Sequence, residues 1–146
     1  SWDVSNVTNL YLLFESCTNF NGNISDWNVS NVTSLDSTFR ECSNFNQDIR
    51  SWNVGNVRST VNTFRNCSNF NQDLGWWNVG RVTNMDYMLY NATSFNQNLS
   101  YWCVSYFQTG FNKPGRPSYF NNYTPMTSAE LPLWGNCPSP KPGQPT

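Results

Sequence analysis

The residues best suited to covalent chemistry are five cysteines, and the chain holds no histidine to assist them. A cysteine or serine nucleophile needs a base to take its proton, and histidine is the usual partner. A zinc site needs converging ligands, but the sequence contains neither histidine nor a C-x-x-C pair. We therefore expect no metal site, no bound cofactor and no catalysis by a thiol.

Paired carboxylates are the next chemistry to consider, because glycoside hydrolysis uses two of them. Asp48 and Asp73 are successive copies of one sequence position, at which Asn23 and Asn98 stand in the other copies. A position shared by aspartate and asparagine indicates a turn rather than an acid–base pair. No glycine-rich phosphate loop is present either. The sequence thus predicts a protein that is not an enzyme and has no catalytic residues.

These positions belong to a repeat with a fixed period of 25 residues. Tryptophan, phenylalanine, valine and cysteine recur in register, and Ala92 takes the fourth cysteine position. Three of these columns are Trp2, Trp27, Trp52, Trp77 and Trp102; Phe20, Phe45, Phe70 and Phe95; and Cys17, Cys42 and Cys67. Such a period is typical of a solenoid, in which each unit buries its apolar face by stacking on its neighbours.

Each unit divides into a predicted strand and a predicted short helix. The first half has the spacing of a leucine-rich-repeat strand in Ile24, Trp27 and Val29, and the intervening positions face outward. Apolar residues in 32–42 lie three or four residues apart, which is the spacing of a helix. The predicted fold class is α/β, a leucine-rich-repeat-like solenoid of about four strand-plus-short-helix coils.

Two further columns are interpreted as structural. An asparagine column comprises Asn21, Asn46, Asn71 and Asn96. We expect its amides to form an internal ladder that satisfies the backbone of a turn. The cysteine column accepts alanine, so Cys17, Cys42 and Cys67 are expected to be buried free thiols that pack as small apolar residues. Neighbouring coils would bring these thiols within disulfide reach, but parallel Cβ vectors disfavour the bond.

The repeat resembles the BspA-like leucine-rich repeats, and more closely their 25-residue relatives in surface lipoproteins of mycoplasmas. The resemblance is carried by "WNVSNVTSLDSTFRECSNFNQDI" and its sister units, over residues 1–104. It implies an extracellular or cell-surface protein used for adhesion, matrix building or partner binding. Residues 105–137 lack the repeat pattern, so the resemblance implies little about them.

Three regions are predicted along the chain: a repeat solenoid over 1–104, a C-terminal cap over 105–137 and a proline-rich tail over 138–146. The second region is rich in aromatic residues broken by proline and glycine, which suits an irregular cap on the end of a solenoid. The tail is expected to be an extended linker. Cys103 lies at an outward strand position and Cys137 closes the cap, so we predict a disulfide between them, formed in an oxidising compartment.

N-x-S/T sequons occur at eight positions, and some of them are expected to carry glycans if the source is a eukaryote. Asn66 and Asn91 are the first candidates, because the end of the predicted helix should face solvent. The further candidates are Asn6, Asn31, Asn28 and Asn122. Sequons at interior positions are not expected to be modified.

Two aromatic residues are candidates for ligand binding. Trp76 and Tyr101 are successive copies of one outward strand position. Together they fit a stacking platform for a sugar ring or for a side chain of a partner. The alternative is that both lie beneath the cap, where the predicted disulfide holds them.

The net charge of −1 argues against nucleic acid as a partner, and no apolar run approaches the roughly 20 residues that cross a bilayer, so no membrane insertion is expected. The start at Ser1, without a signal peptide, favours a part of a longer protein. We expect an extracellular or cell-surface, non-catalytic structural or adhesive module that associates with itself head to tail. The alternative is a monomeric recognition module that binds glycans or proteins on its strand face.

Overall fold

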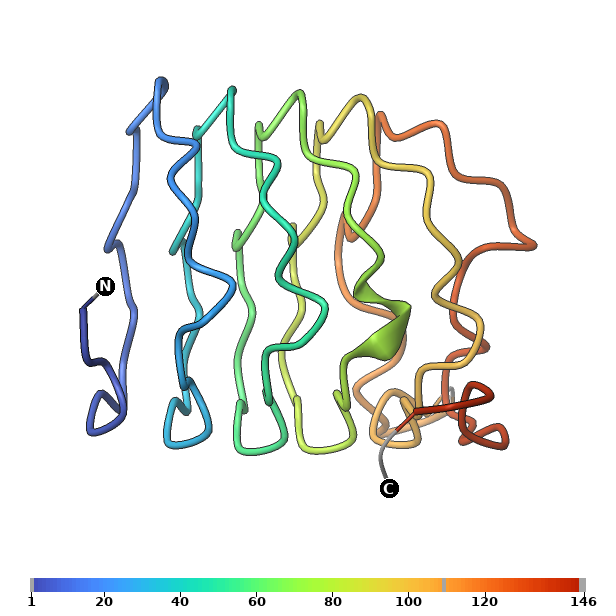
Figure 1. The fold of residues 1–146 in the computed structure, drawn as a ribbon. Helices are drawn as coiled ribbons and strands as arrows, with labels where there is room; N and C mark the ends of the chain where they lie inside the picture. Colours follow the sequence, from blue (N-terminus) through green and yellow to red (C-terminus); the bar gives the residue numbers. More distant parts are fainter. Residues whose placement is uncertain (1, 109, 145–146) are drawn as a thin grey trace.

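A computed structural model describes residues 2–108 and 110–144. Consecutive 25-residue units lie side by side in one row, from the N-terminal unit to the last segments of the chain (Figure 1). Within the described residues, the only helix is a 3-10 helix, η1 (Leu74–Trp76), and β pairing is limited to isolated parallel bridges. These bridges join Asn9 to Ser34, Ser34 to Ser59 and Ser59 to Asn84. The predicted α/β class, a leucine-rich-repeat-like solenoid of strand-plus-helix coils, is therefore wrong.

The segment predicted as a helix, residues 32–42, forms a run of tight turns instead. Arg40 N donates to Ser37 O of the same unit at 3.3 Å. The next N–H, that of Glu41, donates to Arg65 O of the following unit at 2.8 Å. Ser37 and Glu41 have positive φ angles of 55° and 64°, which an α-helix does not contain. The spacing identified the buried side chains, but every second N–H bonds between units rather than along a helix.

The segments predicted as strands are joined by side chains. Residues 24–29 and 49–54 exchange no backbone hydrogen bond with each other. The indole Nε1 of Trp52 donates instead to Ile24 O at 3.0 Å. The same bond recurs from Trp77 to Ile49 and from Trp102 to Leu74. The tryptophan column therefore does the work of a strand ladder, because each indole both packs in the core and satisfies a buried carbonyl.

Aromatic columns form the core along the row. Phe45 stacks on Phe70 with ring centroids 5.7 Å apart. Phe39 stacks on Phe64 at 5.6 Å and, within its own unit, on Phe45 at 4.1 Å. All four rings are fully buried. Since each ring recurs at the same position in the next unit, the burial of one ring depends on its neighbours.

The asparagine column forms a ladder, but at the surface rather than in the interior. Asn21 Oδ1 accepts the backbone N–H of Asn46 at 2.9 Å, and Asn46 Oδ1 accepts that of Asn71 at 3.0 Å. Gln47 Nε2 adds a bond to Asn21 Oδ1 at 3.0 Å. Asn21, Asn46 and Asn96 are exposed. The amides thus supply backbone partners between units, as expected, along the rim of the row.

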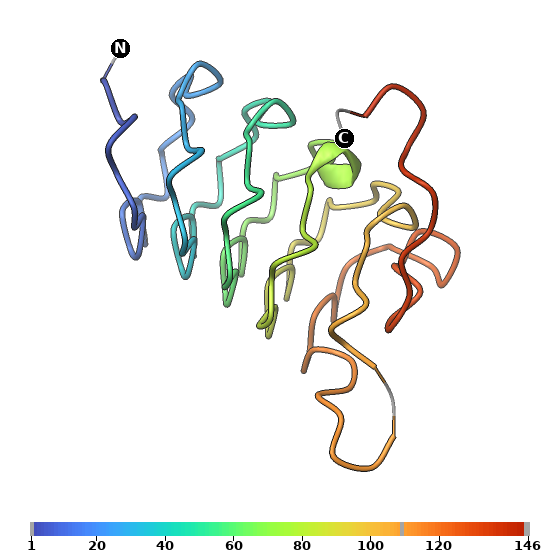
Figure 2. The same ribbon diagram turned by 90° about the horizontal axis from the view of Figure 1, so that it is seen from below.

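The region predicted as an irregular cap contains a projecting loop and one more layer of the row, as Figure 2 shows. Tyr87 N donates to Ser118 O at 2.9 Å, as Asn62 N donates to Asp86 O within the repeats. Donor and acceptor are 31 residues apart in the first pair and 24 in the second, so the loop adds seven residues. We call residues 117–137 the final layer.

The final layer keeps the spacing of the tryptophan segments. Leu131 and Trp134 are three residues apart, as are Leu99 and Trp102 in the preceding unit. Leu99 N donates to Glu130 O at 2.7 Å, which joins the two layers. The final layer escapes the 25-residue period because the inserted loop shifts its register.

The proline-rich tail contacts η1 over residues 138–144 (Figure 2). Lys141 Nζ forms an ion pair with Asp73 Oδ2 at 2.7 Å. Gln144 Nε2 donates to Trp76 O at 3.1 Å. These contacts fasten the tail to the side of the row, beside the predicted ligand-binding tryptophan.

Candidate functional site

A groove of about 650 Å³ opens between two adjacent units and the tail. It is lined by Arg50, Ser51, Trp52, Asn53, Val54, Trp76, Asn78 and Gly143. Most of these residues occupy outward positions of the predicted strand half, so the sequence located the right face although that half is not a strand. The lining mixes a tryptophan ring with amide, hydroxyl and guanidinium groups, which is typical of a binding site for a polar ligand.

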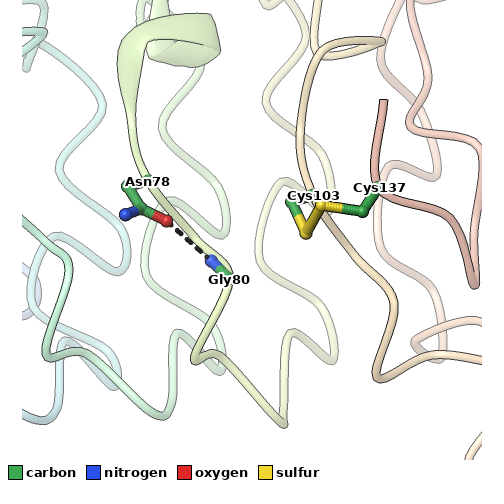
Figure 3. The surroundings of a disulfide bond; sticks show 4 residues. All are labelled: Asn78, Gly80, Cys103 and Cys137. Atoms are coloured by element: carbon green, nitrogen blue, oxygen red, sulfur yellow. Dashed lines mark hydrogen bonds between the residues drawn. A yellow bond between two sulfur atoms is a disulfide. The ribbon is translucent and has the colours of Figure 1, made fainter. Parts of the chain in front are cut away.

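Two asparagines of the groove are oriented by turns. Asn53 Oδ1 accepts the N–H of Gly55 at 3.1 Å, and Asn78 Oδ1 accepts the N–H of Gly80 at 3.1 Å (Figure 3). Neither Nδ2 group has a hydrogen-bond partner among the residues that the structure describes. The turns therefore hold both side chains in place and leave both amide N–H₂ groups able to donate to a ligand.

Trp76 lines the groove and is contacted by the tail. Lys141 Nζ lies over its ring, 4.9 Å from the ring centroid. A Cβ placed on Gly143 would lie 3.5 Å from the ring, so the tail touches it there as well. The indole is half-buried, and these contacts fix its orientation.

Tyr101, the second predicted platform residue, does not line the groove. Among the described aromatic rings, Tyr101 and Trp76 form no stacked pair. The structure therefore separates the two candidates: Trp76 belongs to the groove, with the tail rather than a second ring beside it. Arg50, Asn53 and Asn78 were not predicted as binding residues, although the outward position of the two asparagines was visible in the sequence.

The predicted disulfide between Cys103 and Cys137 is present, with an S–S distance of 2.06 Å (Figure 3). It joins the last regular unit to the end of the final layer. Both cysteines occur once outside the cysteine column, so the sequence gave a distinct pair. The bond favours an oxidising compartment.

The cysteine column contains free thiols, as predicted for all three residues. Cys42 and Cys67 are buried, whereas Cys17 is exposed, so the prediction of burial is wrong for Cys17. Cys42 Sγ contacts Phe14 O at 2.9 Å. Burial raises the pKa of Cys42 to about 12 and also raises that of Cys67. A thiol that stays protonated at neutral pH is a poor nucleophile, so these residues act as packing groups.

The final layer has an unpaired backbone edge, formed by Tyr119, Asn121 and Tyr123. Their N–H groups have no hydrogen-bond partner within the described chain. At the same positions one layer earlier, the N–H groups of Tyr87 and Asn91 bond to the final layer. We call the three residues the C-terminal edge, and their N–H groups form a row of donors without acceptors.

Tyrosine rings and one guanidinium support this edge. Arg65 lies over the rings of Tyr87 and Tyr90, 5.1 and 5.2 Å from their centroids. Tyr119 stacks on Tyr87 at 4.9 Å, and Tyr123 meets Tyr90 edge-on at 5.3 Å. Tyr119 and Tyr123 are nevertheless 54% and 69% exposed. Burial raises the pKa of Tyr90, with a further contribution from Tyr123. Tyrosine and arginine are the residues most enriched in binding hot spots.

The sequon asparagines differ in their surroundings. Asn66 and Asn91, the first candidates, are half-buried, and Asn91 Nδ2 donates to Asn66 Oδ1 at 3.1 Å. The other four candidates, Asn6, Asn28, Asn31 and Asn122, are exposed. Asn31 Nδ2 is engaged with Ser5 O at 2.8 Å. Glycosylation itself stays a prediction.

Two kinds of site were searched for in the described residues. No group of three or more metal-ligating side chains converges there. No helix in that part of the chain is long and apolar enough to cross a membrane.

A family model described as "Mycoplasma protein of unknown function, DUF285" matches residues 1–108. The match covers the repeats and stops within the projecting loop, where the 25-residue register is lost. No curated protein and no solved structure matches the chain.

Proposed function

The chain belongs to the family described as "Mycoplasma protein of unknown function, DUF285", and we propose that it is a non-catalytic structural or adhesive repeat module of the cell surface that associates with itself. The disulfide supports a location outside the reducing cytosol. The resemblance of the repeats to BspA-like surface proteins supports the same location, although the leucine-rich-repeat fold is not adopted.

The observation that carries self-association is the C-terminal edge. In every earlier interface, N–H groups at these positions bond to carbonyl groups of the following unit. Tyr119, Asn121 and Tyr123 present the same row of donors without acceptors. Exposed backbone rows are templates on which another chain can add.

The first unit presents the matching acceptors. The carbonyl groups of Asn9, Tyr11, Leu13 and Glu15 occupy the positions that accept from the preceding unit elsewhere in the row, and they have no donor among the described residues. Exposed apolar side chains accompany them, with Leu13 41% exposed. A second copy that stacked in register would place its Leu13 on Phe120 of the final layer.

This contact is heterologous, because the donor row of one copy meets the acceptor row of another. Repetition of the contact gives a filament when the rotation does not close and a ring when it does. Regular extension at the surface is the function that such a contact provides.

The test is sedimentation of residues 1–146 over a concentration series, followed by electron microscopy. We expect the wild-type protein to form larger species as concentration rises. Tyr123→Lys should remove the donor side and Leu13→Lys the acceptor side, so each variant alone should stay monomeric. A 1:1 mixture should form dimers, because each variant keeps the side that the other lacks.

Phe111→Lys is the matched control, since Phe111 is an exposed aromatic residue on the projecting loop, away from both rows. It should assemble as the wild type does. A wild-type chain that stays monomeric throughout, or a Tyr123→Lys variant that assembles normally, would contradict the proposal.

A further inference from the structure

We infer that the groove between Asn53, Asn78 and Trp76 is a binding site for a neutral saccharide. This function is separate from self-association, because the groove lies on the side of the row whereas the two backbone rows lie at its ends (Figure 1). Neither inference depends on the other.

The apolar part of the site is the Trp76 ring. Pyranose rings carry faces of C–H groups, which pack on aromatic rings, while their hydroxyl groups need hydrogen-bond partners. The Trp76 indole is half-buried and fixed by its contacts to the tail, so little conformational entropy is lost on binding. The adjacent Trp52 also lines the groove but is buried, and its Nε1 is used by Ile24.

The polar part of the site consists of two amides in one column. Asn53 and Asn78 occupy the same position in adjacent units, and each uses its Oδ1 to accept from a turn N–H at 3.1 Å. Each Nδ2 is left to donate. Two oriented donors beside an aromatic ring match a ligand that carries hydroxyl or ring oxygens at regular intervals.

The charges at the groove favour a neutral ligand over an anion. Arg50 Nε is bonded to Asp48 Oδ2 at 3.0 Å. Lys141 Nζ is bonded to Asp73 Oδ2 at 2.7 Å. Both cations near the groove therefore have a carboxylate partner, and no uncompensated positive charge is left to attract a phosphate or a sulfate.

The tail completes one wall of the site. Gly143 has a φ angle of 81° and lines the groove beside the ring of Trp76. Gln144 Nε2 holds this segment by its bond to Trp76 O. A saccharide on the ring would contact both a repeat unit and the tail.

The test starts with an array of neutral oligosaccharides built from hexoses and N-acetylhexosamines, followed by calorimetric titration with the best binder. Wild-type protein should bind at least one member of the array. Trp76→Ala should weaken the binding at least tenfold. Tyr101→Ala is the matched control, because Tyr101 occupies the next copy of that position but lies outside the groove, and its affinity should be unchanged.

Aspartate substitution tests the amides without removing their turns. Asp3 occupies this column in the first unit, and its Oδ1 accepts the N–H of Ser5 at 3.0 Å. Hydrogen bonds from Ser5 lower the pKa of Asp3, so an aspartate in this turn is ionised at neutral pH. Asn53→Asp combined with Asn78→Asp should weaken binding at least fivefold, because the ligand would desolvate two carboxylates in place of two donors.

Asn28→Asp is the control for that pair, since Asn28 makes the same turn but does not line the groove. Its affinity should equal that of the wild type. Absence of binding by the wild-type protein across the array, or unchanged binding by the Asn53→Asp and Asn78→Asp double variant, would overturn the inference. Sedimentation of the same variants keeps self-association as a separate readout.

Discussion

Tryptophan occupies the same position in the repeat units and in the final layer, but its environment differs. In the repeats, Trp77 lies parallel to Trp52 with ring centroids 6.5 Å apart, and its indole N–H bonds to a backbone carbonyl. In the final layer, Trp134 meets Phe107 and Phe120 edge-on, at 80° and 81°. Its Nε1 is buried without a hydrogen-bond partner within the described chain.

The difference shows what a fixed period provides. When units follow one another at 25 residues, each side chain meets its own copy, and rings stack while hydrogen bonds repeat. Seven inserted residues before the final layer remove this register. Backbone bonds to the last unit persist there, but the side-chain column does not, and the Cys103–Cys137 disulfide holds the layer in its place.

The largest expected effect comes from interrupting a column. Phe70→Ala removes a fully buried ring that stacks on Phe45 and on Phe95, at 5.7 and 5.9 Å. We expect a loss of about 3–5 kcal/mol in the free energy of unfolding, measured by urea denaturation. Phe111→Ala, at a residue that is 94% exposed, should change it by less than about 0.5 kcal/mol. Equal effects would show that the columns do not carry the stability of the repeats.

Removing the disulfide should have the next largest effect and should be local. Cys103→Ser combined with Cys137→Ser opens a loop with a sequence separation of 34 residues, which costs about 3 kcal/mol in the entropic model. Hydrogen exchange measured by mass spectrometry should show faster exchange in the final layer and unchanged protection in residues 34–92. Uniformly faster exchange would mean that the two regions unfold as one.

The two tryptophan environments can be compared directly by the same substitution. Trp77→Phe leaves Ile49 O without its indole donor, and we expect a cost of about 1–2 kcal/mol. Trp134→Phe removes a buried N–H that has no partner, so the cost should be clearly smaller. The midpoints of urea denaturation of the two variants test this order. A larger loss at Trp134 would mean that its indole N–H is satisfied in solution.

The sequence predicted burial better than it predicted backbone structure. The 25-residue columns identified nearly all of the core, because identical positions in stacked units have identical neighbours. The helix prediction over residues 32–42 failed because turns that bond at i to i−3 give the same spacing of buried residues as a helix. Side-chain spacing carries no information on whether Glu41 N bonds within its unit or to Arg65 O of the next.

The candidate sites show the same limit. Trp76 was identifiable, since it breaks a column of small or polar residues, and Cys103 and Cys137 were identifiable as cysteines outside the cysteine column. The groove wall at Gly143 was not, because the contact of the tail with η1 joins residues about 70 positions apart with no shared pattern. The spacing of Leu131 and Trp134 did signal the final layer, but at an offset that a 25-residue search excludes.

The smallest expected effect distinguishes the cysteine column from the rest of the core through pH. Burial raises the pKa of Cys42 from its ordinary 9.0 to about 12 and raises that of Cys67 as well. Below pH 9 the thiols are protonated in both the folded and the unfolded chain, and their contribution is constant. Above pH 9 the unfolded chain releases protons that the folded chain retains, so stability should fall as pH rises from 9 towards 12.

Thermal denaturation between pH 8 and pH 11 measures this decline. Cys42→Ala combined with Cys67→Ala should flatten it at little cost near neutral pH, because Ala92 already occupies the fourth position of the column. Cys17→Ala, at the exposed thiol, should leave the decline unchanged. The tyrosines titrate in the same range but are identical in all three proteins, so the difference between variants isolates the buried thiols. An equally steep decline in the double variant would assign it to the tyrosine rings at the C-terminal edge, and would move the pH sensitivity from the repeats to the final layer.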